Sequence, residues 1–234
     1  MANVKMKNKF LLMNILIFLF CIFSTKTVFA KTITVAQDGS GNYKTIQAAV
    51  NKSKSGDTII VNPGIYQEPV KIVGKTLNII GTDRDTCMVF YPTNNYTLVP
   101  LYIQAGNVSN MTFYGYGGIQ GYTVHIDNAY QFKRNLTFNN CKIISNSAQD
   151  CLGIGTYGYS TIAFNDCFFE TNFEFMFYHN AISQKYNGPS LIAFNNCNIT
   201  NTGISHIRNI NYNINNPVAI TFNGSVINGV LQEN

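Results

Sequence analysis

After its first 30 residues, the sequence lacks the marks of several common classes of protein. It contains no second apolar run long enough to cross a bilayer, no CxxC pair and no histidine-rich spacing. It also lacks the Leu-x-x-Leu-x-Leu frame of leucine-rich repeats, and it contains no tryptophan. We therefore expect a mature chain that does not insert stably into a membrane, and we expect neither a metal site nor a cofactor.

The N-terminus has the layout of a secretory signal peptide. Lysines precede an apolar run from Phe10 to Phe23, and Val28-Phe29-Ala30 provides compact residues at the positions where cleavage is expected. We predict that residues 1–30 are a signal peptide that is removed after secretion begins. Residues 31–234 would then form one extracellular domain, at the cell wall or the cell surface.

The apparent basicity of the chain comes largely from this N-terminus. The whole sequence has 16 basic and 11 acidic residues, which gives a formal net charge of +5. Four lysines and no acidic residue lie in the predicted signal peptide, so the mature chain is almost neutral. An almost neutral chain gives no reason to expect nucleic acid as a partner.

Five cysteines remain in the predicted mature chain. An odd number without close spacing is not typical of a disulfide scaffold. We expect buried free thiols instead, because cysteine packs as a small hydrophobic residue. The five are Cys87, Cys141, Cys151, Cys167 and Cys197.

A short segment that reads Phe-Asn-Asn-Cys, with small variations, recurs along the chain. Its fullest copies are Phe138–Cys141, Phe164–Cys167 and Phe194–Cys197, and related segments surround Phe113 and Phe222. Successive Phe positions are separated by 25, 26, 30 and 28 residues. A period in this range indicates one structural unit per repeat.

Each copy predicts a short strand followed by a sharp bend. Apolar and polar residues alternate up to the Phe, and the Asn, Asp or Gly that follows tolerates the left-handed backbone of a bend. This pattern favours an all-β fold, a single-stranded right-handed parallel β-helix in which equivalent residues of neighbouring coils stack. We expect the Phe and Cys side chains to form ladders inside the coils.

The residues before the repeats predict a cap on the N-terminal end of the β-helix. Thr45–Val50 is the one convincing short amphipathic helix, and such a helix would protect core side chains and strand edges. Strands are expected at residues 32–36, 58–61, 70–73 and 77–80, with Pro63-Gly64 and Gly81 in the connections.

Four segments of the mature chain follow one another in an order that is informative. They are Ile33–Gln47, Gly64–Glu68, Gln149–Leu152 and Glu174–Tyr178. In order and spacing they resemble the motifs of the pectin methylesterase (pectinesterase) family, in the pectin lyase-like β-helix superfamily. The last three are similar to that family's Gly-x-Tyr-x-Glu, Gln-Asp-Thr-Leu and Asp-Phe-Ile-Phe-Gly.

Other positions show that the chain resembles a divergent member of that family. Tyr122–Ile126 lies where the family has Gln-Ala-Val-Ala-Leu, so Tyr122 stands in place of an oxyanion-hole Gln, although Gln120 is near. Glu174 stands in place of the nucleophilic Asp. Arg208 is the one residue kept from Leu-Gly-Arg-Pro-Trp.

The resemblance implies a secreted carbohydrate esterase that hydrolyses the methyl esters of homogalacturonan (pectin), as a monomer. Asp150 would be the general acid and base, Glu174 the nucleophile and Arg208 the group that orients the nucleophile. Gln149 would stabilise the oxyanion. The other candidates for the oxyanion or substrate-binding site are Gln120, Tyr122, Phe175 and Tyr178.

The residues themselves are compatible with a site of two carboxylates. Asp150 and Glu174 are 24 residues apart, close to one coil, and adjacent coils are about 4.8 Å apart. Two carboxyl groups side by side favour one protonated and one ionised form. Ester hydrolysis needs this division, because one carboxylate attacks the carbonyl carbon and the other group protonates the leaving alkoxide.

Other interpretations stay open on the sequence alone. Asp150 also fits a turn residue, Glu174 a surface residue of an alternating strand, and Arg208 a solvated surface side chain. An alternative function is a catalytically impaired β-helix that binds cell-wall or surface polysaccharide with the same groove. A polysaccharide lyase is a third, but it would need an acidic calcium-binding cluster, and the sequence shows none.

Overall fold

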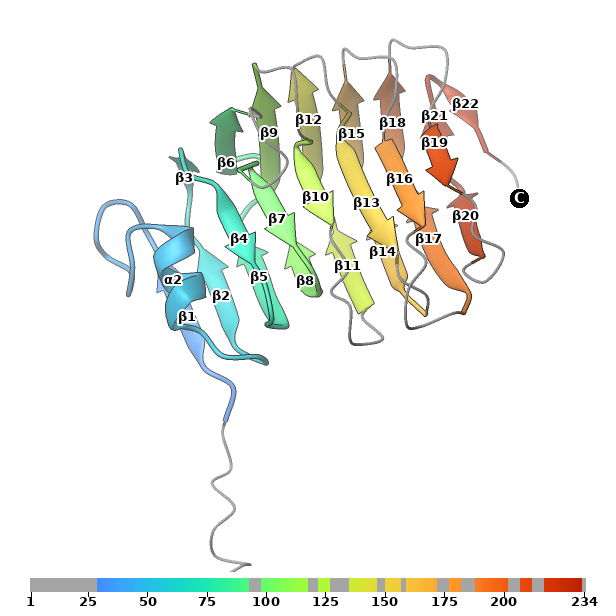
Figure 1. Ribbon diagram of the computed structural model, residues 1–234. Coiled ribbons are helices and arrows are strands. Elements are labelled where there is room, and N and C mark those ends of the chain that lie inside the picture. Colours follow the sequence, from blue (N-terminus) through green and yellow to red (C-terminus); the bar gives the residue numbers. More distant parts are fainter. Residues whose placement is uncertain are drawn as a thin grey trace, which may run out of the picture. The chain divides into compact units, whose positions relative to one another are not determined.

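Parallel strands stacked along one direction make up most of the structure, as Figure 1 shows. The chain is described by a computed structural model over residues 29–92, 98–117, 122–126, 135–146, 150–156, 159–171, 177–181, 188–201, 207–211 and 217–232. Residues 31–234 form one unit by their internal contacts, and residues 1–30 form another. Within the described ranges, no helix is both long and apolar enough to cross a membrane.

The strands form three sheets, which we call A, B and C. In spatial order, sheet A contains β1 (Thr32–Val35), β2 (Thr58–Val61), β5 (Leu77–Gly81), β8 (Gly106–Ser109), β11 (Asn135–Asn139), β14 (Thr161–Asn165), β17 (Ser190–Asn195) and β20 (Val218–Asn223). Sheet B contains β3 (Gly64–Tyr66), β6 (Cys87–Pro92), β9 (Thr112–Tyr116), β12 (Lys142–Asn146), β15 (Phe168–Thr171), β18 (Asn198–Asn201), β21 (Val226–Ile227) and β22 (Val230–Leu231). Sheet C contains β4 (Val70–Ile72), β7 (Leu101–Ile103), β10 (Val124–Ile126), β13 (Leu152–Thr156), β16 (Phe177–Ala181) and β19 (Ile207–Asn211).

Successive strands of the chain pass from sheet C to sheet A to sheet B and back, so each coil adds one strand to each sheet. Neighbouring strands are parallel, apart from the antiparallel pair β21–β22. This topology confirms the predicted parallel β-helix. The expected strands agree within one residue at each end, but Gly64 and Gly81, expected in connections, are the first residue of β3 and the last of β5.

The helix α2 (Ile46–Lys52) covers the N-terminal end of the β-helix, as predicted. Thr45 is its N-cap, because the Thr45 hydroxyl accepts a hydrogen bond from the Ala48 N–H at 3.3 Å. The Glu68 carboxylate accepts two further bonds, from the N–H groups of Ile46 at 2.7 Å and Gln47 at 2.9 Å. Glu68 therefore satisfies backbone donors that the first turn of a helix leaves without partners in the helix.

Two glutamine side chains cap the first strands of sheets B and C. The Gln47 side chain accepts a hydrogen bond from the Lys71 N–H at 2.6 Å and donates one to the Lys71 carbonyl at 3.3 Å. The Gln37 amide donates to the Ile65 carbonyl at 2.8 Å. An amide side chain thus takes the place of the neighbouring strand that β3 and β4 lack on that side.

The Phe-Asn-Asn-Cys repeat has a different physical role at each of its positions. The Phe side chains point inward and stack, with ring centroids 5.0 Å apart for Phe138–Phe164 and for Phe164–Phe194 and 4.9 Å apart for Phe194–Phe222. The first Asn points outward, and its amide N–H donates to the amide oxygen of the preceding coil, as Asn195 does to Asn165 at 2.8 Å. The sequence is periodic because the same contacts recur in successive coils.

The second Asn makes the bend, and the Cys returns to the interior. Asn110, Asn140, Asp166 and Asn196 have φ angles of 54°, 49°, 53° and 53°, in the left-handed region that Asn and Asp tolerate. The five described cysteines are free and buried, as predicted.

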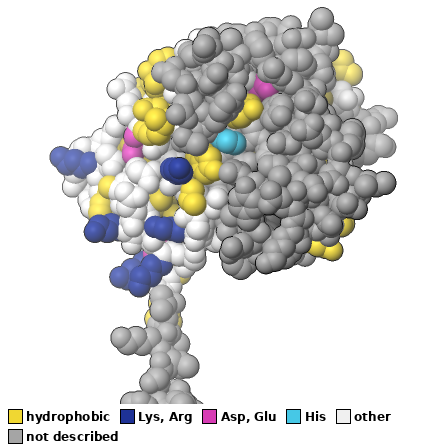
Figure 2. All heavy atoms as spheres, viewed as in Figure 1, with side chains coloured by type: hydrophobic (Ala, Val, Ile, Leu, Met, Phe, Trp, Pro, Cys, Tyr) yellow, Lys and Arg dark blue, Asp and Glu magenta, His cyan; other side chains and the backbone are white. Residues whose placement is uncertain are grey.

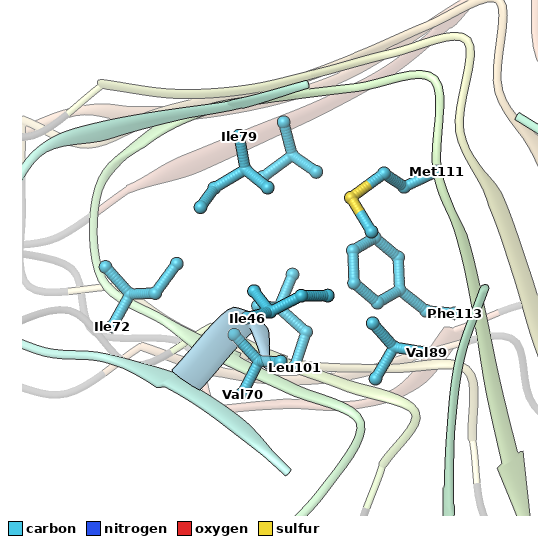
Figure 3. A pocket seen from close by; sticks show the side chains of 9 residues that line it. Ile46, Val70, Ile72, Ile79, Val89, Leu101, Met111 and Phe113 are labelled. Carbon is cyan, nitrogen blue, oxygen red and sulfur yellow. The ribbon is translucent and has the colours of Figure 1, made fainter. Parts of the chain in front are cut away.

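A small apolar cavity lies beneath α2, and Figure 3 shows the side chains that surround it. Ile46 reaches it from the helix, while Met111 and Phe113 reach it from the coil of β9. Its lining is wholly apolar, so ordered water has no polar partner there. The complete lining is Ile46, Val70, Ile72, Ile79, Val89, Leu101, Val108, Met111 and Phe113.

Candidate functional site

One row of residues runs across the six strands of sheet C, with one residue from each strand paired to its neighbour on the next strand. The row contains Lys71, Tyr102, His125, Gly153, Tyr178 and Arg208, each paired with the next. On β4, β7 and β10 the residues on either side of the row are buried in the core, so Lys71, Tyr102 and His125 lie on the outer face of the sheet. We call it the sheet C row.

The sheet C row comes from a second repeat that our sequence reasoning missed. Val70-Lys71-Ile72, Leu101-Tyr102-Ile103, Val124-His125-Ile126 and Leu152-Gly153-Ile154 share an aliphatic residue, a variable residue and an isoleucine. The aliphatic residues face the core and hold the variable one outward. Aligning these triplets would have brought Lys71, Tyr102 and His125 into the candidate site, although the histidines show no spacing of their own.

The first three members of the sheet C row contact one another. The Lys71 ammonium lies 5.0 Å from the centroid of the Tyr102 ring, in a cation–π arrangement. The Tyr102 and His125 rings meet edge to face, with centroids 5.0 Å apart. Figure 2, which looks onto this face, shows basic side chains gathered over the N-terminal coils. This part of the face is therefore aromatic and basic.

Tyr122 lies beside the row and packs onto the next coil. Its ring centroid is 5.4 Å from that of His125, and it is 9% exposed. A Cβ atom placed on Gly153 would come within 2.1 Å of the Tyr122 ring, so the ring rests on the backbone of β13. Glycine at position 153 makes this contact possible, since any larger residue would displace the tyrosine.

Asp150 lies two residues before β13, at the same offset that Tyr122 has from β10. The offsets are equivalent because Val124 and Leu152 are paired. Asp150 is 1% exposed. Its carboxyl group therefore lies in a protected position at the edge of sheet C, beside the coil that supplies Tyr122.

Cys151 follows Asp150 in the chain, but its surroundings are those of a core residue and not those of a nucleophile. Its thiol lies 3.1 Å from the Glu170 carbonyl and 3.6 Å from the Ile143 carbonyl, to which it donates. Burial raises the pKa of the Cys151 thiol well above its ordinary value, and the charge of Asp150 adds to this effect. The thiol stays protonated, and Cys151 packs as a core residue.

The described part of the chain contains no group of three or more His, Cys, Asp and Glu side chains arranged to hold a metal ion.

Comparison with known proteins bears on the N-terminal coils. Residues 32–105 match a family model described as Pectinesterase. A comparison with curated proteins finds none that matches. Among solved structures, pectin methylesterase from carrot is similar at 20% sequence identity with a TM-score of 0.47, over 76% of this chain and 66% of that one.

The pectinesterase match includes the cap and ends before the candidate catalytic residues. Within it, the Gly-x-Tyr-x-Glu motif has a structural role in this chain. The Tyr66 hydroxyl donates to the Asn62 carbonyl at 2.8 Å, and Glu68 caps α2. These hydrogen bonds hold the first coil against the helix. The motif therefore has a structural role here and supplies no group to sheet C.

The remaining candidates are placed only in part. Gln120, Gln149, Glu174 and Phe175 lie outside the described residues. Tyr178 and Arg208 lie on β16 and β19, and their backbones are paired in the sheet C row. The strands β13, β16 and β19 are neighbours in sheet C, so Asp150 and Arg208 belong to the coils on either side of β16, as the repeat spacing predicts.

Proposed function

We propose that residues 31–234 are a secreted pectin methylesterase, which hydrolyses the methyl esters of homogalacturonan on the outer face of sheet C. The observation that carries this proposal is the position of Asp150. It is a protected carboxyl group two residues before β13, on a β-helix whose first coils match the pectinesterase family model. The aromatic and basic start of the sheet C row suits a sugar polymer that carries carboxylates.

In the proposed mechanism, the Glu174 carboxylate attacks the carbonyl carbon of a methyl ester. The tetrahedral intermediate collapses as Asp150 donates its proton to the departing methoxide, which leaves as methanol. Asp150, now ionised, removes a proton from a water molecule that attacks the acyl-enzyme anhydride. The galacturonic acid carboxyl group is released and loses its proton to the solvent, Glu174 is ionised again, and Asp150 holds the proton taken from the water.

The other candidates would act around this pair. Arg208, two coils from Asp150, would hold the nucleophile ionised and oriented through a charge-assisted pair. Gln149 and Gln120 would donate to the oxyanion, and Phe175 and Tyr178 would contact sugar rings. Tyr122 would form part of the groove floor. We propose that the enzyme acts as a monomer after removal of residues 1–30 and needs no metal or organic cofactor.

Methanol release from highly methylated pectin by purified residues 31–234 tests the proposal. We expect release by the wild-type chain and a loss on the order of a hundredfold or more in Asp150→Asn. Asp166→Asn is the matched control, because Asp166 lies at a bend where other coils have Asn, and we expect its rate to equal that of the wild type. Equal rates in Asp150→Asn and the wild type would exclude Asp150 from catalysis.

A second candidate function is a non-catalytic β-helix that binds polysaccharide on the same face. The packing of Tyr122 on Gly153 favours it, because that ring stands where the resemblance would place an oxyanion-hole Gln. This function predicts that the wild-type chain binds pectin without releasing methanol. It further predicts that His125→Ala, which removes one ring from the sheet C row, weakens binding.

A further inference from the structure

The outer face of sheet B carries a cluster of aromatic side chains away from the candidate site. The rings of Phe90 and Tyr116 are stacked, with centroids 4.4 Å apart and an interplanar angle of 18°. Tyr114 lies on the other side of Phe90, with centroids 5.1 Å apart. All three side chains are half-buried. We call these three residues the aromatic platform.

Strand alternation accounts for the outward position of the platform. Val89 and Phe113 are buried in the core, and the residues that follow them on β6 and β9 are Phe90 and Tyr114. The next coil adds a polar group at the edge, because the Asn146 amide donates to the Tyr114 hydroxyl at 3.0 Å. That bond holds the Tyr114 ring in one orientation.

Sheet A differs from sheet B in what it presents outward. Across β2, β5, β8, β11, β14, β17 and β20 the outward positions carry small polar or aliphatic residues and neither an aromatic ring nor a charge. Aromatic rings are thus not a general filler of outward positions in this β-helix. Cross-strand packing alone does not call for them, because sheet A is stacked in the same way without them.

The charges around the platform are balanced. On the neighbouring strands, Lys142 lies over the Phe168 ring, with its ammonium 5.2 Å from the centroid. Glu170 lies two residues after Phe168 on β15. One positive and one negative side chain give this part of sheet B no net charge. The sheet C row, in contrast, begins with Lys71, whose ammonium lies over the Tyr102 ring.

We propose that the aromatic platform binds a linear uncharged polysaccharide, at a site distinct from the proposed esterase groove. Pyranose rings have apolar C–H faces and polar hydroxyl edges, which match tyrosine rings with hydroxyl groups and an adjacent amide. The platform lies on the outer face of a sheet, which suits an extended chain, whereas a small ligand calls for a concave pocket. The balanced charge selects an uncharged polymer over polygalacturonate.

Affinity electrophoresis of residues 31–234 in gels that contain a soluble uncharged β-1,4-glucan tests this site. We expect the wild-type chain to be retarded, and we expect the retardation to persist in about 0.5 M salt because no charge pair is involved. The variant Tyr114→Ala/Tyr116→Ala should lose at least about tenfold in affinity, in keeping with the loss of two aromatic contacts. Tyr116→Phe should retain binding, which separates ring loss from unfolding.

Two controls make the result specific. Leu191→Ala removes an exposed apolar side chain from sheet A and should leave retardation unchanged. Asp150→Asn should also bind the glucan normally, so failure of the esterase proposal does not affect this one. The inference is overturned if the wild type is not retarded, if the double variant is retarded equally, or if polygalacturonate alone retards the chain and salt abolishes the effect.

Discussion

The first coil and the repeated coils of this β-helix are stabilised in different ways. The first coil depends on contacts between unlike groups, such as the Glu68 carboxylate on α2 and the Gln47 amide on β4. The repeated coils depend on contacts between like groups, such as stacked Phe rings and bonded Asn amides. Like contacts recur with the chain's period, whereas each unlike contact occurs once. The comparison predicts that single changes act differently in the two regions.

The largest effect is expected in the repeated coils, at Phe164. Its ring stacks on Phe138 and Phe194 and meets Phe169 edge to face at 5.3 Å, and it is fully buried. We expect Phe164→Ala to lower the free energy of unfolding by about 3–5 kcal/mol, measured by urea denaturation. Leu191→Ala, on the outside of the next coil, should change it by less than about 1 kcal/mol.

The next largest effect is expected in the cap. Glu68→Ala removes the acceptor of two helix N–H groups, and we expect a loss of about 1.5–3 kcal/mol by the same measurement. Glu170→Ala on the outer face of sheet B is the control and should change stability by less than about 0.5 kcal/mol. Equal effects of the two changes would show that the cap contributes no specific stabilisation.

A smaller effect is expected from one rung of the outer Asn ladder. Asn165 donates to Asn139 and accepts from Asn195, both at 2.8 Å. Asn165→Ala should cost about 1 kcal/mol, because the bonds are exposed to competition from water. Hydrogen exchange should report the change at β11 and β17 while β1 and β2 stay as protected as in the wild type. Loss of protection in the first coil would contradict the separation of the two regions.

The smallest effect is expected at the cavity under α2, and it has the opposite sign. Val89 lines this cavity, and Val89→Ile adds one methyl group that can enter it. We expect stabilisation of up to about 1 kcal/mol, seen as a higher thermal midpoint. A lower midpoint would indicate that the surrounding core has no room for the added group.

The repeats allowed most of the fold to be predicted, and the cap only in outline. Phe138, Asn140 and Cys141 each have a role that recurs in the next coil, so the fold class could be predicted from their repeated pattern. The helix at residues 46–52 could be expected from its own periodicity. The partners of Glu68 and Gln47 could not, because these contacts join residues more than 20 positions apart and leave no period in the sequence.

The coils that carry the candidate residues were predictable from the repeat, whereas the site itself stays a prediction. The spacing of Asp150 and Arg208 placed them two coils apart, and the structure does so. The sheet C row was missed because Lys71, Tyr102 and His125 differ in chemistry, and only the aliphatic residues beside them repeat. A site built of unlike residues on a repeated backbone is found by aligning the residues that face the core.

Methanol release by variants of Glu174 tests the central claim most directly, namely that two carboxylates on neighbouring coils hydrolyse the ester. We predict that the wild type releases methanol and that Glu174→Gln lowers the rate by about a hundredfold or more. Glu174→Asp, which restores the residue expected from the family, should keep or raise the rate. Methanol release that is unchanged in Glu174→Gln, or absent in both the wild type and Glu174→Asp, would contradict the account.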